Sequence, residues 1–262
     1  MVEPWGRTAQ SKGCLDMNAP NDSAASADDV RPSGVCQYFA RNLRPGCQLR
    51  AVDLSGRHSV VHLQQGALDA ACGPYCLLMA LTILGITPQR HITRLSQFES
   101  GKFVELWRML AALFFTGSTS TDLIASLRQT PDIGVAHQIF KGRRTGMANF
   151  CVEQINNDAV VILETKSARR SYGHWTLVVG WEGYGDASVN SRAAHAAPPA
   201  TRALLCLDPS HNEPVLTAYN ARIEVEPSAR WPGTYQVVTS DLSMDRILLE
   251  GAIAIRRVQN AD

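Results

Sequence analysis

The pattern of hydrophobic positions divides the chain into a helix-rich first half and a strand-rich second half. From residue 72 to about 84 nearly every position is apolar (C-G-P-Y-C-L-L-M-A-L-T-I-L), which predicts a buried helix that ends at Gly85 and Pro88. The segment T-S-T-D-L-I-A-S-L supplies a capping residue for another helix. In all, further helices are predicted at 35–50, 90–98, 102–116, 120–129 and 147–157.

The second half contains runs of apolar and β-branched residues separated by turn-forming segments. Such runs predict strands at 159–165, 174–182, 202–208, 234–239 and 251–257, after an earlier strand-like run at 58–65. Residues 183–202 are polar and contain glycine and proline, which predicts an unusually long hairpin loop. Strands at this spacing indicate an antiparallel sheet, and a helical half followed by a sheet half indicates an α+β fold.

Residues 1–34 differ in composition from the rest of the chain. They are rich in Ala, Asp, Ser, Asn, Pro and Gly and show no hydrophobic period, so we expect a disordered or loosely packed tail. The remaining residues, 35–262, are expected to form one domain. A chain of 262 residues buries roughly three quarters of its extended surface and needs no disulfide or metal to stabilise its core.

Composition and charge exclude several classes of protein. The net charge of +1 argues against bulk electrostatic binding to nucleic acid or to an anionic membrane. The longest apolar stretch, 106–115, is too short to span a membrane and carries Arg108. The 21 arginines against 4 lysines, together with abundant alanine, favour a bacterial source.

The seven cysteines indicate a reducing compartment. Their number is odd, their spacing is irregular and the N-terminus has no apolar signal core, so we expect a cytoplasmic protein, with secretion by a signal-independent route left open. Cys72 and Cys76 are one helical turn apart, but no second cysteine pair or nearby histidine completes a zinc site. We therefore expect no metal and no cofactor.

Cys72 is the candidate nucleophile because it lies where a loop of small residues runs into the apolar helix. A helix N-terminus carries partial positive charge and stabilises a thiolate, the reactive form of cysteine. Pro74 is tolerated in the first helical turn, and Gly73 is expected to let a substrate backbone approach closely. In contrast, three cysteines in apolar runs are expected to be inert core residues: Cys76, Cys151 and Cys206.

The other parts of a thiol acyl-transfer site follow in order along the chain. His174 opens an apolar strand and is the expected base, and Asp208 closes the next strand-like run and is expected to orient the imidazole. The oxyanion needs donors, which the Cys72 backbone N–H and an upstream glutamine amide can supply; Gln65 is favoured over Gln64.

Several neighbouring residues have weaker signals. Trp175 is expected to be a core or pocket-wall aromatic, and with Gly73 and Gln64 to line the substrate site. We expect the remaining histidines to be solvated, with a supporting contact to the triad as the less favoured alternative for His62 and His211.

These motifs resemble those of papain-like cysteine peptidases, and they are most similar to the bacterial branch that cleaves double-glycine leader peptides. The resemblance covers roughly residues 58–212 and rests on Gln64-Gln65, Ala71-Cys72-Gly73, His174-Trp175 and Asp208-Pro209. It implies a papain-like fold, a Cys–His–Asp triad, a glutamine in the oxyanion hole and a narrow cleft that accepts glycines. Two features depart from the branch: Ala71 replaces an aspartate, and Gln65 lies seven positions before Cys72 instead of the usual five or six.

The leading hypothesis is thus a cysteine peptidase or isopeptidase that acts on a peptide or protein through a thioester on Cys72. An acyltransferase, a deamidase or a transglutaminase-like toxin or effector would use the same triad with a different acceptor. A catalytically inactive papain-like module would instead bind a partner. A peptide or protein substrate and a regulatory protein are the expected partners, whereas nucleic acid and membrane are not.

Overall fold

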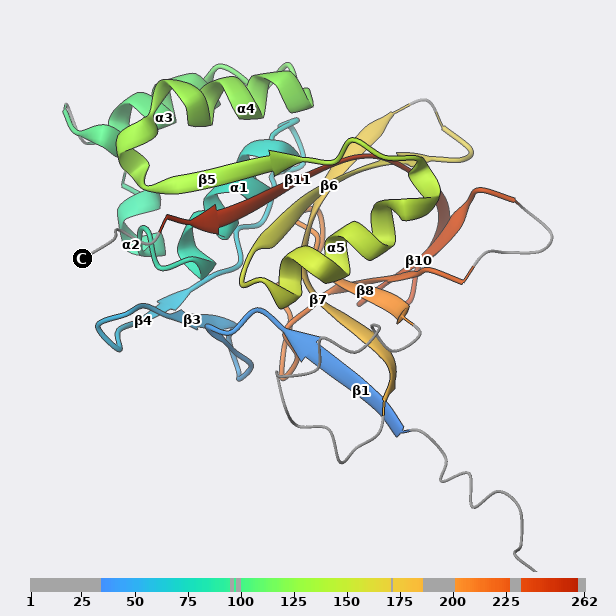
Figure 1. The fold of residues 1–262 in the computed structure, drawn as a ribbon. Helices are drawn as coiled ribbons and strands as arrows, with labels where there is room; N and C mark the ends of the chain where they lie inside the picture. Colours follow the sequence, from blue (N-terminus) through green and yellow to red (C-terminus); the bar gives the residue numbers. More distant parts are fainter. Residues whose placement is uncertain are drawn as a thin grey trace, which may run out of the picture. The chain divides into compact units, whose positions relative to one another are not determined.

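A closed barrel of six antiparallel strands forms the second half of the protein. The computed structural model describes residues 34–94, 97, 100–170, 172–185, 201–226 and 232–258. Hydrogen bonds join the barrel strands in the order β7, β6, β11, β10, β9, β8, and β8 pairs back with β7 (Figure 1). The barrel strands are β6 (Val160–Ser167), β7 (Gly173–Gly185), β8 (Thr201–Leu207), β9 (Ala221–Glu224), β10 (Tyr235–Thr239) and β11 (Met244–Arg257).

Two further strands extend this sheet outside the closed ring. β1 (Gly34–Phe39) pairs with the far end of β7, and β5 (Val135–Ile139) pairs with the end of β11. A separate three-stranded sheet consists of β2 (Leu43–Arg44), β3 (Arg50–Val52) and β4 (His58–Val60). It lies before the helical part of the chain, and β3 contacts the first helix.

The alternation of side chains along the strands separates two cores. On β6, Val161 and Leu163 point into the barrel, whereas Val160 and Ile162 point out of it. Inside the barrel, the apolar side chains form one cluster with helix α5 (Met147–Asn156), which packs against β6, β7, β8 and β11. The outward side chains pack against the helical half of the protein.

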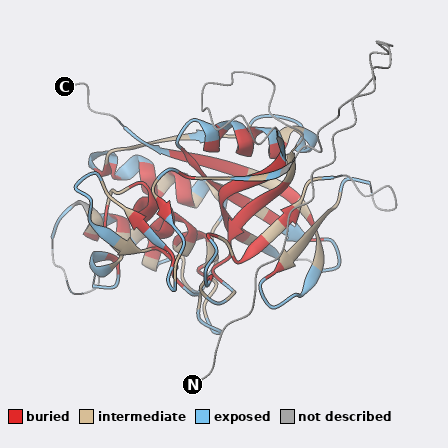
Figure 2. Ribbon diagram, turned by 90° about the horizontal axis from the view of Figure 1, so that it is seen from below, coloured by how far each residue is buried: buried red, intermediate tan, exposed pale blue. Residues whose placement is uncertain are grey.

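Helix α1 (Cys72–Ile83) is the centre of the helical half. Ten of its twelve residues are buried, and it lies against the outer face of β6 and β7. The other helices are α2 (Gln89–Ile92), α3 (Lys102–Ala111), α4 (Ser120–Gln129) and the short 3-10 helices Pro131–Ile133 and Arg144–Gly146. Buried residues follow the barrel strands and the helix faces that meet them, and exposed residues gather on loops (Figure 2).

The predicted helices from residue 72 onward are largely confirmed. The helices at 72–84, 120–129 and 147–157 match α1, α4 and α5, and α3 is a shorter form of the helix predicted at 102–116. Thr119 caps α4 by a capping box with Asp122, whose backbone N–H it accepts at 3.3 Å. Of the helix predicted at 90–98, the described residues show α2, which ends at Ile92.

The helix predicted at 35–50 is wrong, because this segment forms β1, β2 and the start of β3. In β1 the exposed Val35 and Gln37 alternate with the less exposed Cys36 and Tyr38, a period of two that belongs to a strand. Tyr38 stacks on Trp181 of the neighbouring β7, with 4.2 Å between ring centroids. The long-range contact with β7 therefore selects the strand over a local helix.

The predicted α+β class with antiparallel sheets is confirmed, and closure of the sheet into a barrel is an addition. β6, β7, β8, β10 and β11 overlap the five predicted strands, whereas β5 and β9 were not predicted.

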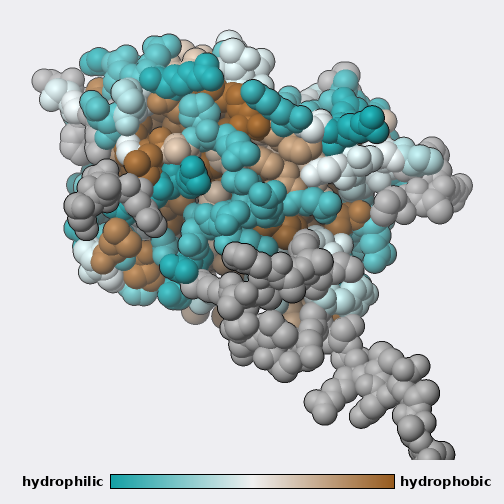
Figure 3. Space-filling model, viewed as in Figure 1, coloured by the Kyte–Doolittle hydropathy of each residue, from teal (hydrophilic) through white to brown (hydrophobic). Residues whose placement is uncertain are grey.

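The tail predicted at 1–34, except Gly34, and most of the loop predicted at 183–202 lie outside the described residues. No helix within the described ranges is long and apolar enough to cross a membrane. Hydrophilic side chains cover much of the face seen in Figure 1 (Figure 3).

Candidate active site

Cys72 is the first residue of α1, as the sequence predicted. The preceding Ala71 supplies no side-chain cap, and its carbonyl accepts the Tyr75 N–H at 2.9 Å. Among the described residues, no acceptor is bound to the backbone N–H of Cys72 or Gly73, and Pro74 has no N–H. The first turn contains no acidic side chain. The positive end of α1 is therefore available to a negative group beside the Cys72 sulfur.

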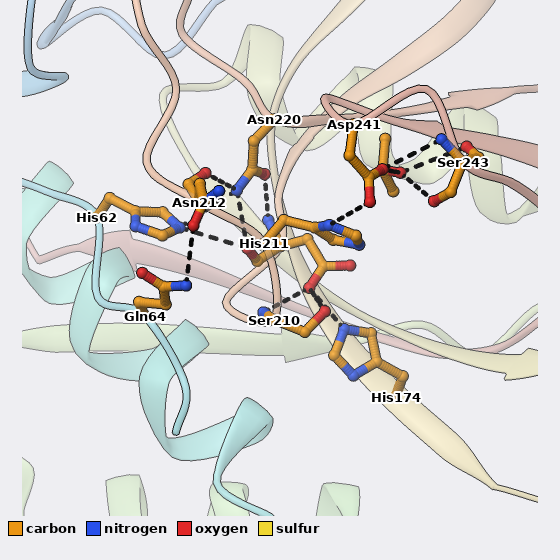
Figure 4. Close-up of polar contacts among 11 residues, drawn as sticks. His62, Gln64, His174, Ser210, His211, Asn212, Asn220, Asp241 and Ser243 are labelled. Atoms are coloured by element: carbon orange, nitrogen blue, oxygen red, sulfur yellow. Dashed lines mark hydrogen bonds and ion pairs between the residues drawn. The ribbon is translucent and has the colours of Figure 1, made fainter. Parts of the chain in front are cut away.

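His174 and Asp208 meet at the rim of the barrel. His174 is the second residue of β7, and Asp208 directly follows β8, whose Leu207 lies opposite Leu177. The imidazole Nε2 lies 2.8 Å from Asp208 Oδ1 (Figure 4). Cys72 and His174 line the same hollow, and the Cys72 thiol contributes to raising the pKa of His174. The structure thus brings the predicted Cys, His and Asp together around the histidine.

The charges of this pair reinforce each other. Burial lowers the pKa of His174, but the charge and hydrogen bond of Asp208, together with the contact to Cys72, outweigh burial and raise this pKa to about 10. Burial raises the pKa of Asp208, but the charge of His174 and hydrogen bonds from His174 and Ser210 lower it to about 2. An imidazolium–carboxylate pair is therefore the favoured state at neutral pH.

Ser210 and Asn220 hold Asp208 in place, and neither was predicted from the sequence. The Ser210 hydroxyl and backbone N–H donate to Asp208 Oδ1 at 2.6 and 2.8 Å. The buried Asn220 accepts the Asp208 N–H at 2.6 Å and donates to the Asp208 carbonyl at 2.9 Å (Figure 4). The D-P-S sequence is a turn signal, which is compatible with the Ser210 bonds, but nothing marks Asn220, which lies twelve residues downstream.

His62 is buried beside this network, so the expectation that it is solvated is wrong. Its Nε2 lies 3.2 Å from Asn220 Nδ2 and 3.3 Å from the Asp208 carbonyl oxygen. Both hydrogens of Asn220 Nδ2 already point to the Asp208 and Asn212 carbonyls, so His62 Nε2 donates to the Asp208 carbonyl or shares a hydrogen of Asn220, depending on its tautomer. Burial lowers the pKa of His62 and favours the neutral imidazole. His211 approaches from the other side, with its backbone N–H donating to the Asp208 carbonyl at 3.3 Å.

The structure distinguishes between the two candidate glutamines. Gln65 lines the same hollow as Cys72 and His174, and its Nε2 donates one hydrogen bond to the Asp69 carbonyl at 2.6 Å. An amide nitrogen carries two hydrogens, so a second donor remains. Gln64 is turned away, because its Nε2 donates to Asn212 Oδ1 at 3.1 Å, and Gln64 does not line this hollow. Gln65 is thus the glutamine placed beside Cys72.

A turn centred on Asp69 takes up the extra residues between Gln65 and Cys72. Asp69 Oδ2 accepts the Gly66 N–H at 2.8 Å, and Oδ1 accepts the Ala71 N–H at 3.2 Å. Ala70 donates to the carbonyl of Phe114 at 2.6 Å, which fixes the loop to the segment after α3. The longer spacing therefore still delivers the Gln65 side chain to the Cys72 hollow.

Gly73 is required by packing inside the protein, and its expected role in substrate approach stays a prediction. A Cβ at Gly73 would lie 2.1 Å from Ser118 Oγ and 3.1 Å from Trp175 Cδ1. Trp175 is buried and donates from Nε1 to the Ser118 carbonyl at 2.9 Å. Trp175 is thus both a core residue and part of the wall of the hollow, as predicted, and it holds the 116–119 loop against the start of α1.

Two hollows meet at His174. One, of about 730 Å³, contains Cys72 and is lined on one side by residues 116–119. The other, of about 650 Å³, opens into the barrel and contains Asp208. Gln65, Tyr172 and His174 line both. Within the described part of the chain, no group of three or more His, Cys, Asp or Glu side chains is arranged to hold a metal ion.

No protein-family model matches the chain, and no curated protein matches it significantly.

Proposed function

We propose that this protein is a cysteine peptidase or isopeptidase of papain-like fold, acting on a peptide or protein substrate. The observation that carries the proposal is the position of His174, which bonds to the Asp208 carboxylate and lines the same hollow as Cys72. The three residues come from a helix N-terminus and the ends of two adjacent strands, so a rigid scaffold fixes their geometry. A central helix that carries cysteine and packs on a barrel that carries histidine also supports the papain-like assignment.

The arrangement supplies each part that acyl transfer requires. An imidazolium beside Cys72 favours the thiolate, which attacks the scissile carbonyl carbon. The Cys72 N–H and the second N–H of Gln65 Nε2 are the proposed donors to the oxyanion, and each such donor typically contributes 10²–10³ in rate. His174 then transfers its proton to the departing amine while the C–N bond breaks. Water, deprotonated by His174, hydrolyses the thioester and regenerates the thiol.

The acid–base pair is prepared for this sequence by its surroundings. Asp208 is held by Ser210 and Asn220 as well as by His174, so its carboxylate is not free to rotate away. The Asp208 bond to Nε2 leaves Nδ1 as the ring nitrogen that faces Cys72. A fixed tautomer and a fixed ring orientation are what a general acid–base histidine requires.

The proposal is tested by trapping the acyl-enzyme. Purified protein is incubated with p-nitrophenyl acetate and with peptide libraries, and the intact mass is measured after rapid acid quench. We expect an acyl adduct on Cys72, its absence in Cys72→Ala, and its retention in Cys47→Ala, which removes an exposed cysteine. Alkylation of Cys72 by iodoacetamide no faster than that of Cys47 would contradict the mechanism and favour an inactive binding module.

A further inference from the structure

The interior of the barrel changes from apolar to polar toward the rim that carries the proposed active site. On β6 the inward row runs from Val161 and Leu163 to Thr165 and Ser167. On the other strands the same rows end in Thr176, Thr239 and Asp245. The apolar part is filled and packed against α5, whereas the polar part encloses the hollow of about 650 Å³. We call this hollow the rim chamber.

One hydroxyl behind the wall of the rim chamber is buried without a strong partner. Thr176 is 4% exposed, and its Oγ1 has no nitrogen or oxygen hydrogen-bond partner among the described residues. Its polar neighbour is the Cys206 thiol, a weak donor and acceptor that does not line the chamber. A molecule in the chamber does not reach this buried oxygen, so Thr176 serves as a control for the polar groups that do face the chamber.

The charge of the rim chamber favours a cation. Asp245 lines it and accepts the Ser167 hydroxyl at 3.1 Å. At the rim, Asp241 accepts the Thr239 hydroxyl at 2.5 Å, and His211 Nδ1 lies 4.0 Å from Asp241 Oδ2 (Figure 4). The charge of Asp208 is already balanced by His174, and none of the described residues lining the chamber is lysine or arginine. Asp69, in the turn before Cys72, and Asp245, among hydroxyl acceptors, therefore leave a net negative charge in the chamber.

The position of the chamber assigns it to one side of the scissile bond. His174 forms part of the wall of both hollows, with Cys72 on one side and the rim chamber on the other. The group that leaves in acylation must lie next to His174, because it receives the proton of the imidazolium. We propose that the rim chamber binds the leaving-group side of the substrate and selects a residue there with a cationic side chain.

This inference rests on the proposed function and specifies its substrate. In acylation, Cys72 Sγ forms a bond to the carbonyl carbon, the C–N bond breaks, and the proton from His174 gives a free amine. In the reverse direction, an amine attacks the thioester carbon, the C–S bond breaks, and the amine proton passes to His174. A subsite that binds the leaving amine therefore also binds an amine acceptor and can be measured in either direction.

The experiment compares lysinamide with norleucinamide, which differ by the side-chain ammonium. Cys72 is acylated with p-nitrophenyl acetate, and the ratio of aminolysis to hydrolysis is measured by mass spectrometry for each amine. We expect about a tenfold preference for lysinamide, the size of one charge-assisted hydrogen bond, and its loss in Asp245→Asn. Thr176→Val, an isosteric change at an oxygen that the chamber does not reach, should leave the preference unchanged. Glu153→Gln removes one negative charge from the exposed side of α5 and should leave it unchanged.

Binding to the Cys72→Ala protein, measured by calorimetry with the same two amides, separates this inference from the proposed function. An absent p-nitrophenolate burst would contradict the proposed function, while calorimetry still reports on the chamber. Equal binding of the two amides to Cys72→Ala, or a lysinamide preference that survives Asp245→Asn, would overturn the inference.

Discussion

The imidazole Nε2 of His174 lies 2.8 Å from Oδ1 of Asp208, and each residue shifts the ionisation of the other. The pKa of His174 is raised from 6.5 to about 10. The contribution of charged His174 to the free energy of unfolding is therefore fully present below pH 6.5 and is lost as the pH rises toward 10. The pKa of Asp208 is lowered from 3.8 to about 2. The contribution of ionised Asp208 to the free energy of unfolding is therefore fully present above pH 3.8 and is lost as the pH falls toward 2. The pair is therefore most stabilising between about pH 4 and pH 6.5.

We predict that this pH dependence disappears when the histidine is replaced. Urea unfolding should show the free energy of unfolding of the wild-type protein falling above pH 6.5, by roughly 3 kcal/mol at most. In His174→Gln the curve should be flatter over the same range. Equal slopes for the two proteins between pH 6.5 and 9 would show that His174 is not held charged in the native state.

Asn220→Ala should reduce both stability and activity. The change leaves the backbone N–H of Asp208 without its buried partner and removes one of the donors to its carbonyl, which should cost about 1–3 kcal/mol of unfolding free energy. Because Asp208 also loses its anchor, the rate of Cys72 acylation should fall more than the fraction of folded protein does. Asn212→Ala is the control, since the side chain of Asn212 accepts a bond from the exposed side chain of Gln64. The measurements are urea unfolding and the p-nitrophenolate burst; similar effects of the two variants would refute the anchoring role.

The two glutamines should respond differently to truncation. Gln65→Ala removes a proposed oxyanion donor and should lower the acylation rate by about 10²–10³. Gln64→Ala should leave the rate within about twofold of wild type, because its side chain bonds to Asn212 outside the Cys72 hollow. Steady-state and burst kinetics on the folded proteins measure both. A larger loss for Gln64→Ala would reverse the assignment.

Gly73→Ala should destabilise the protein through a collision with Ser118. The new Cβ would lie 2.1 Å from Ser118 Oγ, and overpacking of this kind costs about 1–3 kcal/mol. Adding Ser118→Ala removes the colliding oxygen and should recover a large part of the loss. In contrast, Gly46→Ala meets no atom closer than 3.5 Å and should be nearly neutral. A double-mutant cycle by urea unfolding gives the coupling energy, and additive effects would exclude the collision.

The sequence predicted the three residues of the proposed triad because each carries a local signal. Cys72 begins an apolar helix, His174 opens an apolar strand and Asp208 ends another, and such element boundaries can be read from hydrophobic pattern. The packing of α1 on β6 and β7 and the pairing of β7 with β8 then bring these boundaries together.

The supporting residues were missed because their contacts join distant segments. Asn220 bonds to Asp208 and His62, which are 12 and 158 positions away, and nothing in its own neighbourhood distinguishes it from a loop asparagine. Ser118 likewise has its role only because Gly73 and Trp175 pack against it. Closure of the barrel depends on β9, a four-residue strand in which buried Ala221 and Ile223 alternate with Arg222 and Glu224. A pattern that short does not stand out from the surrounding loops.

The proposed triad is divided between two layers, and this has a consequence for inactivation. His174 and Asp208 belong to the barrel, whereas Cys72 reaches them only because α1 packs on the outer face of β6 and β7. Loosening of the helical layer would move the sulfur away from the imidazole while the closed ring of strands keeps the ion pair together. Under mild heat or denaturant, the acylation activity should therefore be lost before the β-sheet circular dichroism signal is. The barrel would then still be folded but inactive.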